Sequence, residues 1–70
     1  MVQLSDNAKA VLILLRAQNH VAHRFDYSWW VLDAAKWELV GKLDGAEHAF
    51  VVAVISFNTA RMRERAAVAA

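Results

Sequence analysis

His20 and His23 are the side chains whose type and spacing come nearest to metal chemistry in this sequence. Residues three apart on a helix are neighbours on its surface, so both imidazoles could reach one ion, with His48 or Asp26 as further ligands. A zinc site requires three or four convergent ligands, and the chain contains neither cysteine nor the Glu-x-x-His pairs of helical di-iron proteins. We therefore expect no bound metal and no other cofactor.

Catalysis has equally little support in the sequence. Arg16 precedes His20 by four residues and His23 by seven, a spacing that is similar to the Arg-and-His motif of the HEPN family of helical ribonucleases. Those domains are considerably longer and carry the motif on a late helix, so no residue role is transferred to this chain. Elsewhere nothing places a nucleophile beside a base and an orienting group. We expect that the protein is not an enzyme.

Aromatic side chains are stronger candidates for binding, because the three tryptophans of the chain lie between Trp29 and Trp37. Tryptophan contributes a large rigid apolar area and is enriched at the centres of protein interfaces. On a helical wheel, Trp29 falls in a sector that also carries charged residues, and we expect this sector to meet water. The sequence therefore predicts a contact site for another protein, formed by Trp29, Asp33, Lys36 and Val40.

A cluster of three arginines, Arg61, Arg63 and Arg65, closes the last long apolar segment. Arginines at this spacing can contact phosphates, which makes nucleic acid a possible partner. The chain as a whole has eight Lys plus Arg against seven Asp plus Glu, and it shows no helix-turn-helix spacing. We favour a solvated helix end and keep DNA binding through these arginines as an alternative.

Length and composition limit the size of the folded core that can position these residues. Seventy residues form one domain, and a chain of this size buries only roughly 60% of the surface that its unfolded form exposes. Yet 59% of the residues are apolar, above the roughly 45–50% of an average soluble domain. Apolar surface should therefore remain after folding. Without cysteines, association with another chain is the natural source of additional stability.

The elements that must position these side chains are helices. With no proline and two glycines, the sequence predicts one helical domain over residues 1–70, with helices over 6–23, 27–40 and 45–65. Ser5 or Asp6 can cap the first helix, and Asp26 the second, where Phe25 and Trp30 have the spacing of a hydrophobic staple.

The turn between the second and third helices depends on two further patterns. Gly41 suits the left-handed position that follows many helix ends, and Asp44 with Glu47 has the spacing of a capping box that starts the third helix at Gly45. An alternative reading extends the second helix through Gly41 to Asp44.

Alanine recurs at every seventh position from Ala46 to Ala67, a repeat that keeps one helical seam facing a partner helix. The apolar residues of the second and third helices also fall on two faces each, and a three-helix monomer hides only one broad face per helix. We predict an all-α fold, either three antiparallel helices or a helical hairpin plus one helix, assembled as a homodimer or higher oligomer. The residues assigned to self-association are Ala46, Ala49, Ala53, Phe57, Ala60, Trp30 and Trp37.

The function expected from these features is that of a small non-catalytic protein that self-associates and binds another protein as a regulator, adaptor or inhibitor. A small dimeric DNA-binding protein and a structural assembly subunit are the alternatives. The sequence begins without the basic stretch of a secretory signal, and its longest apolar runs, 10–15 and 49–55, are too short to span a bilayer. We expect a cytoplasmic location and no membrane partner.

Overall fold

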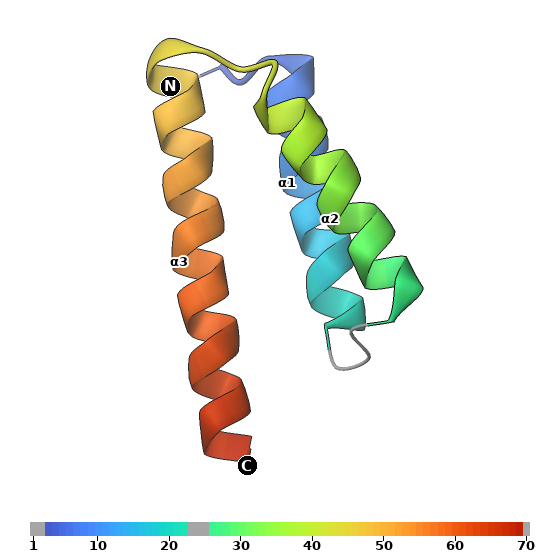
Figure 1. Ribbon diagram of the computed structural model, residues 1–70. Coiled ribbons are helices and arrows are strands. Elements are labelled where there is room, and N and C mark those ends of the chain that lie inside the picture. The colour runs from blue at the N-terminus through green and yellow to red at the C-terminus, as the bar shows by residue number, and fades with distance from the viewer. Residues whose placement is uncertain (1–2, 23–25, 70) are drawn as a thin grey trace.

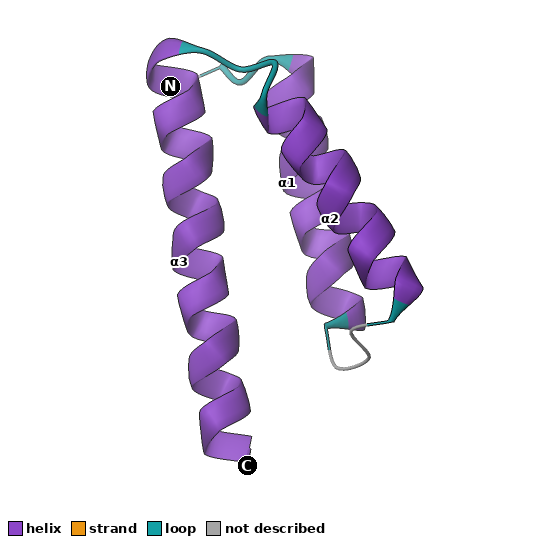
Figure 2. Cartoon of the chain, viewed as in Figure 1, coloured by secondary structure: helices purple, strands orange, loops and turns teal. Residues whose placement is uncertain are grey.

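Helices account for all the regular structure in the described part of the chain, residues 3–22 and 26–69 of the computed structural model. Helix α1 spans Asp6–Val21, α2 spans Tyr27–Val40 and α3 spans Gly45–Ala69. α1 and α2 lie side by side and antiparallel, and α3 runs beside this pair after a short connection (Figures 1 and 2). The prediction of an all-α chain with three helices is confirmed for these residues.

The helix starts follow from side chains that satisfy the free amide groups of a first turn. Ser5 precedes α1 in an extended conformation, and its hydroxyl oxygen accepts a hydrogen bond from the Ala8 amide at 3.2 Å. Asp26 precedes α2 in the same way and accepts from the Ser28 amide at 3.0 Å. Both caps agree with the sequence prediction, while the proposed staple from Phe25 lies outside the described residues.

Gly41 does not adopt the predicted left-handed conformation. Its φ of −62° and ψ of −17° are right-handed helical, and the end of α2 is closed by backbone bonds such as Gly41 N to Trp37 O at 3.1 Å. The positive φ belongs to Gly45, which enters α3 with a φ of 55°. The prediction for Gly41 was therefore wrong, because the turn after α2 needs no left-handed residue, whereas α2 does end at Val40 rather than at Asp44.

Glu47 does not close a capping box with Asp44. Its carboxylate accepts hydrogen bonds from the Ser5 amide at 2.7 Å and from the Ser5 hydroxyl at 2.8 Å. These two bonds hold the pKa of Glu47 below its ordinary value, because they stabilise the charged carboxylate. Glu47 therefore ties the start of α1 to the start of α3.

Two helix ends also differ from the predicted ranges. α1 ends at Val21, with Ala22 as its C-cap, and the remaining predicted residue of that helix, His23, lies outside the described residues. α3 continues to Ala69, beyond the predicted end at Arg65. Alanine has the highest helix propensity, so the alanine-rich C-terminal segment extends the helix instead of terminating it.

The apolar core lies at the end of the molecule where α2 connects to α3. It joins residues from all three helices and the turn after α2, with Val11 and Val51 fully buried. Leu4, Leu39, Val52 and Val54 pack around it. The core members are Ala8, Val11, Leu15, Val40, Leu43, Val51 and Ile55.

The molecule is less compact than a typical folded domain of its length. Its radius of gyration is 12.7 Å, whereas a compact domain of 70 residues has about 11 Å. Its accessible surface is 5243 Å², whereas about 4400 Å² is typical of a folded monomer of 7.8 kDa. About 800 Å² of surface is therefore left in excess of a compact monomer.

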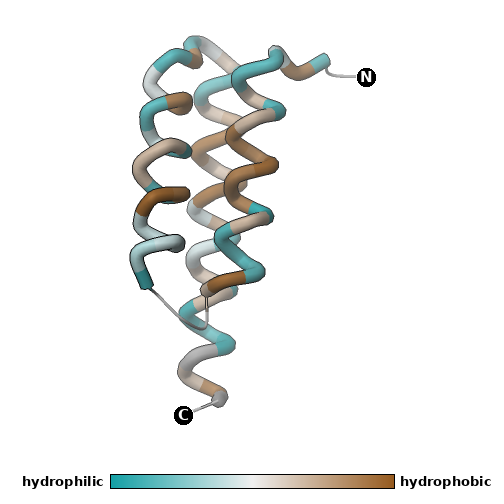
Figure 3. Tube along the Cα trace, turned by 90° about the vertical axis from the view of Figure 1, so that its right-hand side faces the viewer, coloured by the Kyte–Doolittle hydropathy of each residue, from teal (hydrophilic) through white to brown (hydrophobic). Residues whose placement is uncertain are grey.

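Hydrophobic positions occur along every helix but are interrupted by hydrophilic ones (Figure 3). Among the described residues, no helix combines the length and the apolar character that a membrane span requires.

Candidate functional site

The sector of α2 that carries Trp29 does not meet water as predicted. Lys36 and Val40 are buried, and Trp29 and Asp33 are half-buried. The prediction was wrong because α2 packs against α1 through this sector, and the two charged residues neutralise each other there. Lys36 Nζ lies 3.0 Å from Asp33 Oδ1 and 5.0 Å from the centre of the Trp37 ring.

A buried glutamine completes this polar cluster. Gln18 of α1 is 2% exposed, and its Nε2 donates a hydrogen bond to Asp33 Oδ1 at 3.0 Å. Its carbonyl oxygen, Oε1, is buried without a hydrogen-bond partner among the described residues. Burial raises the pKa of Asp33, but hydrogen bonds from Gln18 and Lys36 and the charge of Lys36 outweigh that effect, so the pKa lies below its ordinary value. The carboxylate therefore stays ionised inside the helix pair.

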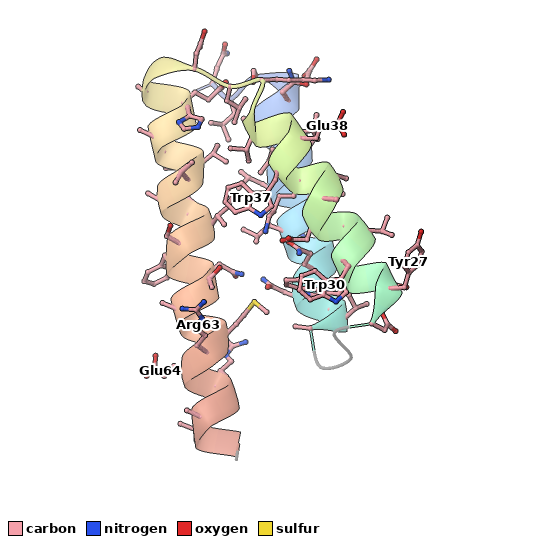
Figure 4. All side chains as sticks on the ribbon, in the orientation of Figure 1. Tyr27, Trp30, Trp37, Glu38, Arg63 and Glu64 are labelled. Atoms are coloured by element: carbon pink, nitrogen blue, oxygen red, sulfur yellow. The ribbon has the colours of Figure 1, made fainter. Side chains whose placement is uncertain are left out.

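A groove opens between this cluster and the C-terminal half of α3. It has a volume of about 950 Å³, at the upper end of the range for ligand-binding pockets. α1 contributes its floor with Leu15 and Gln18, while α2 and α3 form opposite walls. Figure 4 shows Trp37 projecting from α2 toward α3, whereas Tyr27 and Glu38 point away from α3. The aromatic and sulfur-containing members of the walls are Trp29, Trp37, Phe57 and Met62.

Side-chain hydrogen bonds join α1 to α3 beside this groove. The amide of Asn19 donates to Asn58 Oδ1 at 2.8 Å, and the amide of Asn58 donates back to Asn19 Oδ1 at 3.0 Å. Asn58 also donates to the Met62 sulfur at 3.3 Å. This reciprocal pair holds the C-terminal half of α3 at a defined distance from α1.

The arginine cluster lies at the same groove. Arg61, Arg63 and Arg65 are exposed, and all three line it. Arg61 also stacks over the Phe57 ring, with 5.8 Å between the guanidinium carbon and the ring centre. The three residues predicted as a nucleic-acid contact thus share one surface with Trp29, Asp33 and Lys36, three of the four residues predicted to bind a protein.

The outer face of α3, which we define by Ala46, Ala49, Phe50, Ala53 and Ala60, is exposed along its whole length, and Phe57 lies at the edge between this face and the groove. Ala53 lies two residues from each of the buried Val51 and Ile55, and at about 100° per residue it points roughly 160° away from both. Phe50 and Phe57 are 51% and 65% exposed. The alanine repeat therefore points away from α1 and α2.

Trp30 and Trp37, which the sequence assigned to self-association, lie outside the core. They are 58% and 45% exposed, and the Trp30 ring stands edge-on to Trp29 with 4.8 Å between ring centres. Both are on α2, and Trp37 lines the groove rather than the outer face of α3. The residues predicted for self-association are therefore divided between two surfaces.

His20 and His48, two of the side chains considered as metal ligands, are not brought together. His20 lies at the C-terminal end of α1, whereas His48 lies near the start of α3, at the opposite end of the helix pair (Figure 1). No group of three or more His, Asp or Glu side chains in the described part of the chain has the geometry to hold a metal ion. His23 falls outside that part.

Sequence reasoning missed Gln18, Asn19 and Asn58. Gln18 occupies the same helical stripe as Val11 and Leu15, at spacings of seven and three, which is the one pattern that could have placed it inside. No local pattern relates Asn19 to Asn58, 39 residues away.

No family model, curated protein or solved structure matches this chain. The groove and the outer face of α3 are the two candidate binding surfaces of the described residues.

Proposed function

We propose that this chain is a small non-catalytic helical protein that self-associates and binds another protein, as a regulator, adaptor or inhibitor. The observation that supports self-association is the exposure of the outer face of α3, whose alanines and Phe50 are not covered by α1 or α2. The surface in excess of a compact monomer, about 800 Å², is as large as the area that a standard interface buries on each partner. A cytoplasmic location suits a chain without cysteines, since disulfides contribute nothing to its stability.

The outer face of α3 is the surface that we assign to the second copy. Its alanines allow two helix axes to approach closely, and Phe50 and Phe57 add apolar area beside them. A seven-residue repeat matches the small crossing angle of left-handed helix pairs, about 20°. Because this face points away from α1 and α2, a second α3 can pack there without displacing either helix.

Charge favours an antiparallel pair of α3 helices. Glu64 follows Phe57 by seven residues on the same stripe, so a parallel pair would oppose two copies of this carboxylate and bring the arginine clusters together. In an antiparallel pair centred on Ala53, Glu64 lies near Lys42 and the positive helix dipole at the start of the second α3. The arginine clusters are then separated by most of the helix length.

Disulfide trapping tests this arrangement, because the wild-type chain has no cysteine. Ala53→Cys should form a cross-linked dimer on mild oxidation, whereas Ala46→Cys and Ala60→Cys should cross-link only when the two variant chains are mixed. Ile13→Cys, on the exposed surface of α1, is the control. Light scattering over a wide concentration range measures the mass independently. A monomer at every concentration would overturn self-association.

A further inference from the structure

We propose that the groove between α2 and the C-terminal half of α3 binds an amphipathic helix with an acidic flank, carried by the partner protein. This inference rests on the proposed function and specifies the partner's chemistry.

The shape of the groove suits a helix. α3 has 25 residues, about 38 Å at 1.5 Å per residue, whereas α2 has 14 residues and spans about 21 Å. The C-terminal part of α3 therefore extends past the neighbouring pair and leaves one long wall. An additional helix laid along this wall would complete a bundle around the floor that α1 provides.

The apolar side chains of the groove are concentrated on its two walls. Trp37 and Phe57 retain 45% and 65% of their exposure, so both have area left to bury. Met62 is half-buried beside them, and a flexible thioether adapts to different apolar partners. Large exposed aromatic residues in a concave site are the usual energetic centres of helix recognition.

The positive charge of the groove favours acidic residues along one side of the partner helix. Arg61, Arg63, Arg65 and Lys36 line it against one carboxylate, Asp33, so the lining is positive by three charges, whereas the whole chain is positive by one. Lys36 is already paired with Asp33, which leaves the positive charge to the arginines. Arg61 and Arg65 are one helical turn apart, so two acidic residues at the same spacing on the partner can meet both.

Gln18 provides a second and independent indication. It lies in the floor, 2% exposed, and its Oε1 has no hydrogen-bond partner among the described residues. A buried acceptor without a donor costs free energy. Because Oε1 has almost no accessible surface, a hydroxyl or amide donor from an occupant satisfies it only when the Gln18 side chain turns toward the groove. A partner helix with one small polar donor in its apolar stripe fits this floor better than a phosphate backbone, which offers acceptors only.

Two synthetic peptides test the inference. Each has 14 residues, the length of α2, with a leucine stripe containing one serine; one carries glutamates four apart on its flank, and its twin carries lysines there. The acidic peptide should bind roughly tenfold more tightly than the basic twin, and should lose affinity as salt is raised. Binding should change the tryptophan fluorescence and shift the NMR signals of Trp37 and Arg61.

Charge-reversed variants supply the specificity control. The double variant Arg61→Glu, Arg65→Glu should invert the preference between the two peptides, whereas Arg16→Glu, on the exposed surface of α1, should leave it unchanged. Trp37→Ala should weaken binding of the acidic peptide roughly tenfold, and Tyr27→Ala, on the side of α2 that points away from α3, should not. Circular dichroism checks that each variant keeps its helices.

Equal binding of the two peptides, or NMR shifts confined to the outer face of α3, would overturn the inference. Tighter binding of single-stranded or duplex DNA than of the acidic peptide, lost in the same arginine variant, would overturn it in favour of nucleic acid. A stable dimer that binds neither peptide would remove the groove assignment and leave self-association standing. A monomer that binds the acidic peptide would overturn self-association and leave the groove assignment standing.

Discussion

Replacing Asp33 by alanine should destabilise the protein much more than replacing its partner Lys36 by methionine. The two side chains form an ion pair at 3.0 Å, with 24% of the Asp33 side chain and 5% of the Lys36 side chain exposed. Asp33→Ala leaves a buried ammonium group without a carboxylate and removes the acceptor of Gln18 Nε2. Lys36→Met removes the buried charge itself and keeps most of the apolar stem.

The magnitudes follow from burial. Breaking a fully buried pair by removing one partner costs about 3–5 kcal/mol, and the partial exposure of Asp33 reduces this to about 2–3 kcal/mol. Lys36→Met should cost about 0–1 kcal/mol, because the remaining carboxylate keeps the Gln18 bond and some contact with water. A chain of 70 residues has a total stability of about 3.5–10 kcal/mol, so the first loss removes a large share of it.

Urea unfolding followed by circular dichroism measures these differences, at one fixed protein concentration because the proposed self-association would add stability. The double variant Asp33→Ala, Lys36→Met should be more stable than Asp33→Ala alone. The pKa of Asp33 is lowered in the fold, so its contribution is complete above the unfolded pKa of about 3.9 and is lost as pH falls through the folded value. The difference in unfolding free energy between the wild type and Asp33→Ala should therefore become smaller at acidic pH. Equal losses for the two single variants, or a double variant that loses their sum, would refute the reasoning.

Three further perturbations test other parts of the fold. Gly45→Ala should cost about 1 kcal/mol of unfolding free energy, because its φ of 55° strains a β-carbon, whereas Gly41→Ala, at a right-handed position, should be neutral or slightly stabilising. Val51→Ala should cost about 1–3 kcal/mol in urea unfolding, because the side chain is fully buried, and a loss below 0.5 kcal/mol would place it outside the core. Ser5→Ala should cost about 0.5–2 kcal/mol through the lost cap and, in an NMR titration, should raise the pKa of Glu47 toward its ordinary value. With the serine intact, the stabilisation from Glu47 should be present above its unfolded pKa and disappear as pH falls through the lowered folded value.

Local chemistry explains the features that the sequence alone determined. The capping side chains of Ser5 and Asp26 accept hydrogen bonds from backbone amides only two or three residues further along the chain. The local sequence is therefore enough to predict both caps. The existence of three helices and the excess of apolar residues follow in the same way from composition and spacing. The left-handed glycine was assigned to Gly41 because Gly41 directly follows a helix end, whereas in the folded turn the positive φ belongs to Gly45, the first residue of α3.

The tertiary structure decided which face of each helix is buried. The apolar residues of α2 fall on two faces, so its periodicity does not decide which face is buried. The sector of Asp33 and Lys36, expected to meet water, packs against α1 because these two residues pair with each other and Asp33 accepts a hydrogen bond from Gln18. Gln18 and Asp33 are 15 residues apart, and the hydrogen bond between them forms only once α1 and α2 pack. Whether a helix face is buried depends on which other face packs against it, and this pairing is set only by the tertiary structure. The groove beside α3 has the same origin, because a helix of 25 residues packs against two shorter ones.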